Sequence, residues 1–173
     1  MPKIIENVRE MLLATAKEQV CLQGYAKTTI RSVAGACGLG VGTVYNYFPS
    51  KDMLIATFVW EDWRDCLQEM KSQPSSDATA VLNGMYVSLQ RFIQKHQALF
   101  ADKDAAKVFA TVFSERHKQL RDQLAAIILP VCEHSRGENK AFVAEFLAES
   151  LLAWVVEGKP FSEPAAIFRL LLQ

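Results

Sequence analysis

The 173-residue sequence contains few of the residues that interrupt helices. It has only eight glycines and six prolines, and it lacks the alternating, valine-rich runs that form half-buried strands. Half of its residues are nevertheless hydrophobic, which is enough to build a core in a chain of this length. These features predict an all-α protein, made of one domain or of a small domain joined to a larger one.

Long apolar segments are also missing. No stretch approaches the roughly twenty apolar residues that a membrane-spanning helix needs. The N-terminal residues form a charged amphipathic pattern, which is not that of a signal peptide. We therefore expect a soluble, cytoplasmic protein with no membrane partner.

Motifs for catalysis or metal binding are absent. The three histidines are scattered, and the four cysteines lack the close spacing of metal ligands. We expect reduced thiols that are buried as small hydrophobic groups, with redox sensing by one of them as an alternative. There is no nucleophile elbow or paired-carboxylate motif, and no strand precedes the glycines at 38, 40 and 42. We expect no enzyme activity, no catalytic residue, no metal site and no cofactor.

The net charge is zero, but the charges are unevenly distributed. Residues 1–51 contain six lysines and arginines against three glutamates, whereas residues 52–173 contain 13 basic and 16 acidic residues. The first part therefore carries +3 and the second −3. A mildly basic N-terminal region is consistent with one end of the protein lying near phosphates.

Residues 28–51 predict two short helices joined by a tight turn. Thr28 and Thr29 can cap the first helix with a hydroxyl. Gly38 can adopt the left-handed conformation that ends it. In the second helix, about residues 41–48, Val44 and Phe48 form an inner face, and the outer side has short or hydrogen-bonding side chains without an acid. This arrangement is a helix-turn-helix, which can place its second helix in a DNA major groove.

An ordinary helical hairpin inside an all-α core would show the same bare pattern. Tyr45, Tyr47 and Lys51 favour the DNA-binding interpretation, because hydrogen-bonding and cationic groups near the end of the second helix are suited to phosphate contacts.

The same region resembles the N-terminal DNA-binding domain of TetR-family transcriptional regulators. The resemblance covers about a third of the chain, up to Leu54, and its matching residues are Gly24-Tyr25, Thr28-Thr29-Ile30, Val33-Ala34, Cys37-Gly38-Leu39 and the run from Gly42 to Asp52 (GTVYNYFPSKD). It implies a three-helix DNA-binding domain over residues 1–50, followed by a helical effector-binding and dimerisation domain over residues 51–173.

The family's DNA-contacting positions can be assigned to residues of this sequence. They are Thr29, Arg31, Val41, Gly42, Thr43, Tyr45, Tyr47 and Lys51. The sequence departs from the family at Gly40, where a Ser or Thr cap is common, at Val41, where polar or basic residues are frequent, and at Tyr47, often a histidine. We predict that Val41 contacts a thymine methyl group, Thr43 a neighbouring base or methyl, and Arg31 a guanine.

The remainder of the chain predicts further helices at about residues 50–72, 78–96, 105–114, 115–134, 139–157 and 162–172. The first helix is expected at 3–23, a single-turn piece at 98–104, and a kink at Pro130. Aromatic and methionine side chains could line an apolar ligand pocket, although core packing explains them equally well. These candidates are Trp60, Trp63, Met85, Tyr86, Phe92, Phe109 and Phe113.

The last two predicted helices, about residues 139–172, are too apolar for one chain to cover. In the family the corresponding helices form the homodimer interface. We therefore predict a dimeric regulator, in the usual case a repressor, that binds a palindromic operator in double-stranded DNA. A small apolar or aromatic effector would release it. One alternative is a regulator whose second domain docks a protein partner, and a weaker one is a small helical enzyme or carrier.

Overall fold

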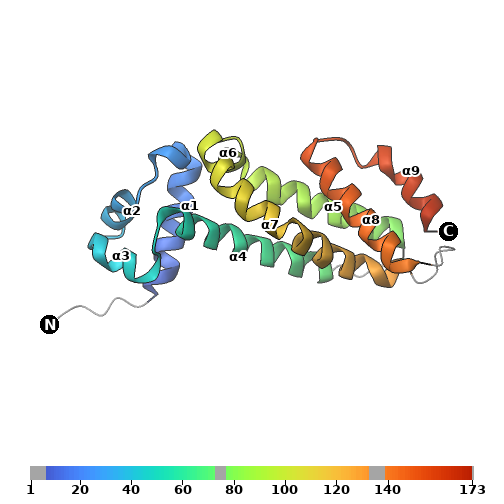
Figure 1. Ribbon diagram of the computed structural model, residues 1–173, viewed down its shortest axis with the longest axis horizontal. Coiled ribbons are helices and arrows are strands. Elements are labelled where there is room, and N and C mark those ends of the chain that lie inside the picture. Colours follow the sequence, from blue (N-terminus) through green and yellow to red (C-terminus); the bar gives the residue numbers. More distant parts are fainter. Residues whose placement is uncertain (1–6, 73–76, 133–138, 173) are drawn as a thin grey trace. The chain divides into compact units, whose positions relative to one another are not determined.

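The computed structural model describes residues 7–72, 77–132 and 139–172, with the backbone alone for residues 108–116 (Figure 1). Every regular element in these ranges is helical, which confirms the all-α prediction. The elements are α1 (Val8–Lys27), α2 (Ile30–Ala36), α3 (Val41–Tyr47), α4 (Lys51–Ser72), α5 (Ala78–Lys95), α6 (Gln97–Phe100), α7 (Lys103–Ile128), the 3₁₀ helix η1 (Leu129–Cys132), α8 (Lys140–Val156) and α9 (Ser162–Leu171).

The predicted end of the first helix is confirmed at Gly24. This residue has a φ of 82° and a ψ of 171°, so it interrupts the helical backbone inside α1. A residue with a side chain would be strained at this φ. The predicted start of the helix, at residue 3, lies outside the described residues.

The prediction of two helices at residues 105–114 and 115–134 is wrong, because α7 is continuous from Lys103 to Ile128. The sequence of α7 contains no glycine and no proline, so nothing interrupts its backbone hydrogen bonds near Ser114. Pro130 lies in η1, after the end of α7, and does not kink the long helix.

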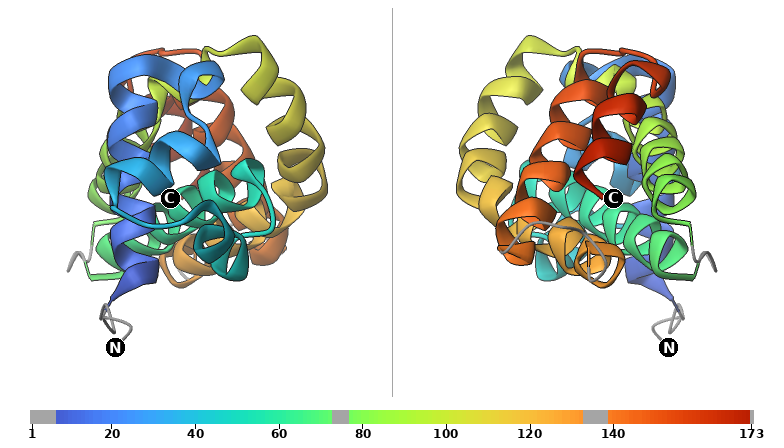
Figure 2. Two further views of the ribbon diagram at one scale, coloured as in Figure 1. Left: turned by 90° about the vertical axis from the view of Figure 1, so that its left-hand side faces the viewer. Right: turned by 90° about the vertical axis from the view of Figure 1, so that its right-hand side faces the viewer.

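The chain divides into two compact units. The first contains the chain up to Asp62 together with His96–Val112, and so includes α1, α2, α3, α6 and the first parts of α4 and α7. The left view of Figure 2 shows α1, α2 and α3 of this unit in blue to cyan. Its core is built by apolar side chains from α1 to α4, namely Leu12, Ala16, Val20, Val33, Val44, Phe48, Leu54 and Ile55.

Ion pairs connect three elements of the first unit. Lys17 of α1 lies 2.8 Å from Asp62 of α4, and the same carboxylate lies 3.0 Å from Nε2 of His96, at the start of α6. Arg9 pairs with Glu61 at 2.7 Å. The Arg9–Glu61 pair is partly exposed and contributes little to stability.

The second unit contains Trp63–Lys95 and the chain from Phe113 onward. It includes α5, η1, α8, α9 and the remaining parts of α4 and α7. Its core is formed by Met70, Leu82, Met85, Leu89, Leu124, Ile128, Leu147, Leu151 and Phe168. The Tyr86 hydroxyl of α5 donates to the backbone carbonyl of Lys159, which ties α5 to the connection between α8 and α9.

These units are defined by packing, and both α4 and α7 contribute to each of them. The predicted domain boundary between residues 50 and 51 separates a DNA-binding domain from an effector-binding and dimerisation domain, and it stays a prediction. Among the helices described, none combines the length and the apolar character that crossing a membrane requires.

Candidate nucleic-acid interface

The first helix of the predicted helix-turn-helix begins at a capping box. The Thr29 hydroxyl accepts a hydrogen bond from the amide of Ser32 at 3.0 Å, and the Ser32 hydroxyl accepts one from the amide of Thr29, also at 3.0 Å. This reciprocal pair satisfies two amides that a helix start leaves without partners. The predicted capping role is thus confirmed for Thr29, whereas the Thr28 hydroxyl donates to the Gly24 carbonyl at 2.9 Å and does not cap α2.

The turn between α2 and α3 is closed by Gly38, which has a φ of 65°. The amide of Leu39 donates to the carbonyl of Ala34 at 2.9 Å, and the amide of Gly38 to that of Gly35 at 3.1 Å. These two bonds form a Schellman motif, which requires a left-handed residue where Gly38 stands. The local sequence therefore fixes the angle at which the chain leaves α2.

The second helix, α3, begins at Gly40, which makes no side-chain cap. Val44 and Phe48 are buried, as predicted, and hold α3 against the core of the first unit. Opposite them, Tyr45 and Tyr47 are 51% and 47% exposed, and Val41 is also exposed. The outer side of α3 therefore presents two phenol groups and one apolar side chain to solvent.

The charged side chains of the helix-turn-helix segment, residues 28–51, are all positive. Arg31 and Lys51 are the only charged residues between positions 28 and 51. Arg31 is exposed on the first turn of α2, Thr29 is exposed at its cap, Gly42 is exposed and Thr43 is half-buried. With no carboxylate in the segment to repel phosphates, the electrostatic field over it favours an anionic partner.

Lys51, in contrast, is engaged within the protein. Its ammonium donates to the backbone carbonyl of Tyr25 at 3.0 Å and lies 3.6 Å from the centre of the Tyr25 ring. The Tyr25 hydroxyl donates to the carboxylate of Asp52. These contacts join the end of α1 to the start of α4, directly after α3. A phosphate contact by Lys51 stays a prediction. The Lys51 ammonium would have to bind the phosphate while it also contacts Tyr25.

Burial raises the pKa of Tyr25, and the hydrogen bond to Asp52 and the charge of that carboxylate raise it further. The unfolded chain, with an ordinary tyrosine pKa of about 10, therefore releases the Tyr25 proton at lower pH than the folded chain does. This contribution to stability is fully present below pH 10 and is lost as the pH rises above that value.

We expect Tyr25→Phe to lower the free energy of unfolding by about 1.5 kcal/mol near pH 7, because it leaves Asp52 without this donor. The variant should also lose less stability than the wild type when urea unfolding is repeated above pH 10. Tyr47→Phe is the matched control, since that ring is exposed, and should change stability by less than about 0.5 kcal/mol. Equal pH dependence of wild type and Tyr25→Phe would contradict this prediction.

The predicted pocket residues lie mainly in the cores of the two units. Trp60 is half-buried in the first unit, whereas Trp63, Met85, Tyr86 and Phe92 are buried in the second. Trp63 packs edge-to-face on Phe92, with the ring centres 5.3 Å apart, and its Nε1 donates to Oε1 of Gln123 at 2.9 Å. The side chains of Phe109 and Phe113 lie outside the described residues. An effector pocket at these positions stays a prediction.

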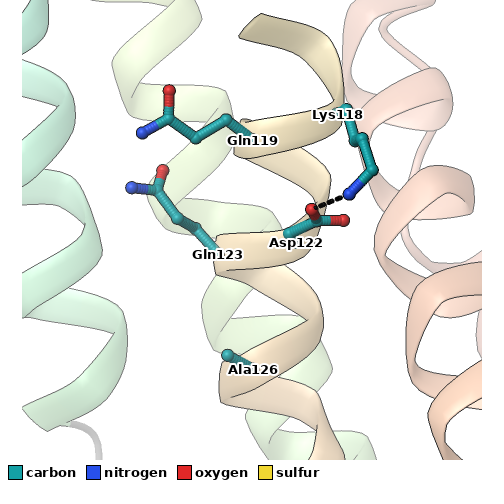
Figure 3. A pocket seen from close by; sticks show the side chains of 5 residues that line it. All are labelled: Lys118, Gln119, Asp122, Gln123 and Ala126. Atoms are coloured by element: carbon teal, nitrogen blue, oxygen red, sulfur yellow. Dashed lines mark hydrogen bonds and ion pairs between the residues drawn. The ribbon is translucent and has the colours of Figure 1, made fainter.

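A hollow of about 490 Å³ lies instead along α7, lined by Lys118, Gln119, Asp122, Gln123 and Ala126 (Figure 3). Lys118 and Asp122 form an ion pair at 2.6 Å, and the two glutamine amides point away from that pair (Figure 3). Four of the five lining residues have polar side chains, and none of the five belongs to the predicted pocket. In the part of the chain that the structure describes, no three His, Cys, Asp or Glu side chains are grouped so as to hold a metal ion.

Two sets of contacts near this surface were not predicted. Asp52, in the first turn of α4, accepts the hydrogen bond of the Tyr25 hydroxyl. Gln19 of α1 contacts Ser32 of α2 with both atoms of its amide. Nothing in the local sequence distinguishes Gln19 from the other polar residues of α1.

Comparison with known proteins agrees with this geometry. The sequence profile for bacterial regulatory proteins of the tetR family matches residues 12–57, which span most of α1, all of α2 and α3 and the start of α4. No curated protein sequence matches the chain.

Several crystal structures are similar over most of the chain. A transcriptional regulator from Cytophaga hutchinsonii ATCC 33406 has a TM-score of 0.66 and 25% sequence identity, over 86% of this chain and 80% of that one. A TetR-like transcriptional regulator from Rhodococcus sp. RHA1 has a TM-score of 0.59 and 19% identity, over 98% and 96%. The fatty acid degradation regulator FadR from Bacillus halodurans has a TM-score of 0.61 and 17% identity, over 98% and 96%. At the last two identities the likeness concerns the fold alone.

Proposed function

We propose that this chain, a DNA-binding transcriptional regulator of the TetR family, is a repressor that binds a near-palindromic operator as a homodimer. The observation that carries the proposal is the outer side of α3. It belongs to a segment without carboxylates, it exposes Tyr45 and Tyr47, and its opposite side is anchored in the core by Val44 and Phe48. A short, rigidly held helix of this kind is suited to entering a major groove.

The contacts can be divided by their chemistry. Tyr45, Tyr47 and Thr29 would donate hydrogen bonds to phosphates, which position the protein without reading sequence. Val41 would contact a thymine methyl group and Arg31 a guanine, with Thr43 at a neighbouring base. Gly42 and Lys51 complete the proposed surface. Selection of bound duplexes from a random pool with purified protein tests this assignment, and absence of a thymine preference opposite Val41 would remove that contact.

The homodimer is supported by the character of α8 and α9. Ala144, Leu147 and Leu151 of α8 are buried in the second unit, yet Phe142 on another face of the same helix is 62% exposed. Leu170 of α9 is 72% exposed. The right view of Figure 2 shows the two helices side by side, in orange and red. Exposed apolar side chains on adjacent helices favour burial against a second copy. The full set is Phe142, Phe146, Val156, Ile167 and Leu170.

We further propose that a small apolar or aromatic effector releases the dimer from DNA by binding among Trp63, Met85, Tyr86 and Phe92. Because all four side chains are buried, the effector has to displace packed groups. Helix α4 contributes residues to both units. A shift in the second half of α4 would therefore be transmitted along the helix to its start, next to α3.

An effector found by compound screening should reduce operator affinity about 5- to 150-fold, the usual size of such coupling. By linkage, saturating operator DNA should weaken effector binding by the same factor, which can be followed through tryptophan fluorescence. A compound that binds equally well with and without operator would not be an effector. A protein partner that releases DNA while no small compound does so would support docking of a protein by the second domain.

A further inference from the structure

Gln19 of α1 holds Ser32 of α2 with both ends of its amide. Its Nε2 donates to the Ser32 backbone carbonyl at 3.1 Å, and its Oε1 accepts from the Ser32 hydroxyl at 2.6 Å. The side chain is half-buried. Two hydrogen bonds from one planar amide fix both the position and the orientation of Ser32 against α1.

Ser32 is also the residue that closes the capping box with Thr29. Its hydroxyl has a single proton, which can go to Gln19 at 2.6 Å or to the Thr29 carbonyl at 2.9 Å. The contact with Gln19 is the shorter of the two, and the same oxygen accepts the Thr29 amide at 3.0 Å. The contact with Gln19 and the capping box therefore share one hydroxyl.

Helix α2 depends on such support because it is short. It has seven residues and no acidic side chain in its first turn, and an isolated helix of this length is not stable in water. The side chain of Ile30 is buried, while those of Thr29 and Arg31 on either side are exposed. The orientation of this first turn thus decides where Thr29 and Arg31 point.

We propose that Gln19 is a positioning residue for DNA binding, which acts through Ser32 to hold Thr29 and Arg31 in the orientation that meets the duplex. The proposal rests on the DNA contacts proposed above for Thr29 and Arg31. It gives Gln19 a role distinct from those residues, because its own amide is occupied by Ser32.

The test compares Gln19→Leu, Ser32→Ala and the double variant in the full-length protein. Each is titrated with a duplex selected from a random pool, and with a mixed-sequence duplex at several salt concentrations. Gln19→Leu should weaken binding to the selected duplex about tenfold. It should also lower the preference for the selected duplex over the mixed-sequence duplex, because Arg31 is proposed to contact a base. The affinity of the double variant should be no lower than that of the weaker-binding single variant. Both substitutions disrupt the same chain of contacts, which runs from Gln19 through Ser32 to Thr29.

Two further variants separate positioning from general destabilisation. Gln23 lies one turn later on α1, and its Nε2 donates to Oε1 of Gln19 and to the Lys27 carbonyl, both at 3.4 Å. Gln23→Leu keeps both contacts between Gln19 and Ser32, so it should leave the affinity and the preference for the selected duplex unchanged. Gln19→Met keeps the length of the side chain and loses both hydrogen bonds to Ser32 without adding a charge. It should therefore bind DNA as weakly as Gln19→Leu does.

The outcome with Arg31→Ala distinguishes failure of this proposal from failure of the proposed function. If Arg31→Ala weakens binding while Gln19→Leu does not, the positioning role is overturned and the DNA surface stands. If Arg31→Ala binds as the wild type does, the proposed surface is wrong and the role of Gln19 falls with it. Additive losses from Gln19→Leu and Ser32→Ala, or an unchanged preference for the selected duplex, would also overturn the positioning role.

Discussion

Replacing Tyr45 and Tyr47 together by alanine is expected to weaken binding to the selected operator by at least about ten-thousandfold. A hydrogen bond to a charged group contributes roughly 1.5–3 kcal/mol, and a symmetric dimer loses each contact twice. Both rings are about half exposed, so their removal should change the stability of the fold by less than about 1 kcal/mol. Fluorescence anisotropy with a labelled duplex measures the affinity, and urea unfolding measures the stability.

The phenylalanine variants show which part of each tyrosine matters. Tyr45→Phe and Tyr47→Phe keep the rings and remove only the hydroxyl donors, so each should reproduce a large part of the alanine effect if the hydroxyls contact phosphates. Binding to a mixed-sequence duplex should fall in parallel, because phosphate contacts carry little sequence information. Val87→Ala, an exposed apolar position on α5, serves as the control. Wild-type affinity in the Tyr45→Ala, Tyr47→Ala double variant would exclude the outer side of α3 as the DNA surface.

Introducing Asp at both Phe142 and Leu170 is expected to convert the homodimer proposed above into a folded monomer. Both side chains are largely exposed in the single chain, so the substitutions should leave the second unit folded. In a dimer they would place carboxylates in an apolar interface without partners, at a cost of about 3 kcal/mol or more for each. The dimer dissociation constant should rise at least about a thousandfold. Analytical ultracentrifugation measures this shift directly.

Operator binding should fail together with dimerisation. Each monomer retains its own α3 surface, but it loses the gain in effective concentration that comes from linking two binding modules. The monomer should therefore bind half-sites weakly and lose its preference for a palindrome. Val87→Asp, which adds the same charge to another exposed apolar position of the second unit, should remain dimeric. A dimer that persists in the Phe142→Asp, Leu170→Asp variant would place the interface elsewhere on the chain.

The local features of the helix-turn-helix were predictable from the sequence. The cap at Thr29, the left-handed turn at Gly38 and the burial of Val44 and Phe48 were all predicted and all confirmed. Each depends on residues within one or two helical turns of one another, where hydroxyls, missing side chains and apolar spacing act directly on the backbone.

The prediction of a helix boundary within α7 was wrong. The wrongly predicted boundary lies where the side chains change from apolar to charged, near Ser114. Such a change alters the surroundings of a helix while its backbone hydrogen bonds continue, and only glycine, proline or a cap interrupts those bonds. The continuous backbone hydrogen bonds therefore set the length of α7, and the change in side-chain polarity did not.

The sequence by itself determined the helical class, the turn at Gly38 and the side of α3 that faces outward, because these follow from short-range backbone chemistry and from apolar periodicity. Tertiary structure alone decided that Lys51 lies on Tyr25, that Asp52 accepts the Tyr25 hydroxyl and that Gln19 holds Ser32. It also placed Trp63, Met85, Tyr86 and Phe92 inside the core. Polar partners that lie 13 to 27 residues apart are selected by the way whole helices pack, and no local pattern in the sequence records that choice.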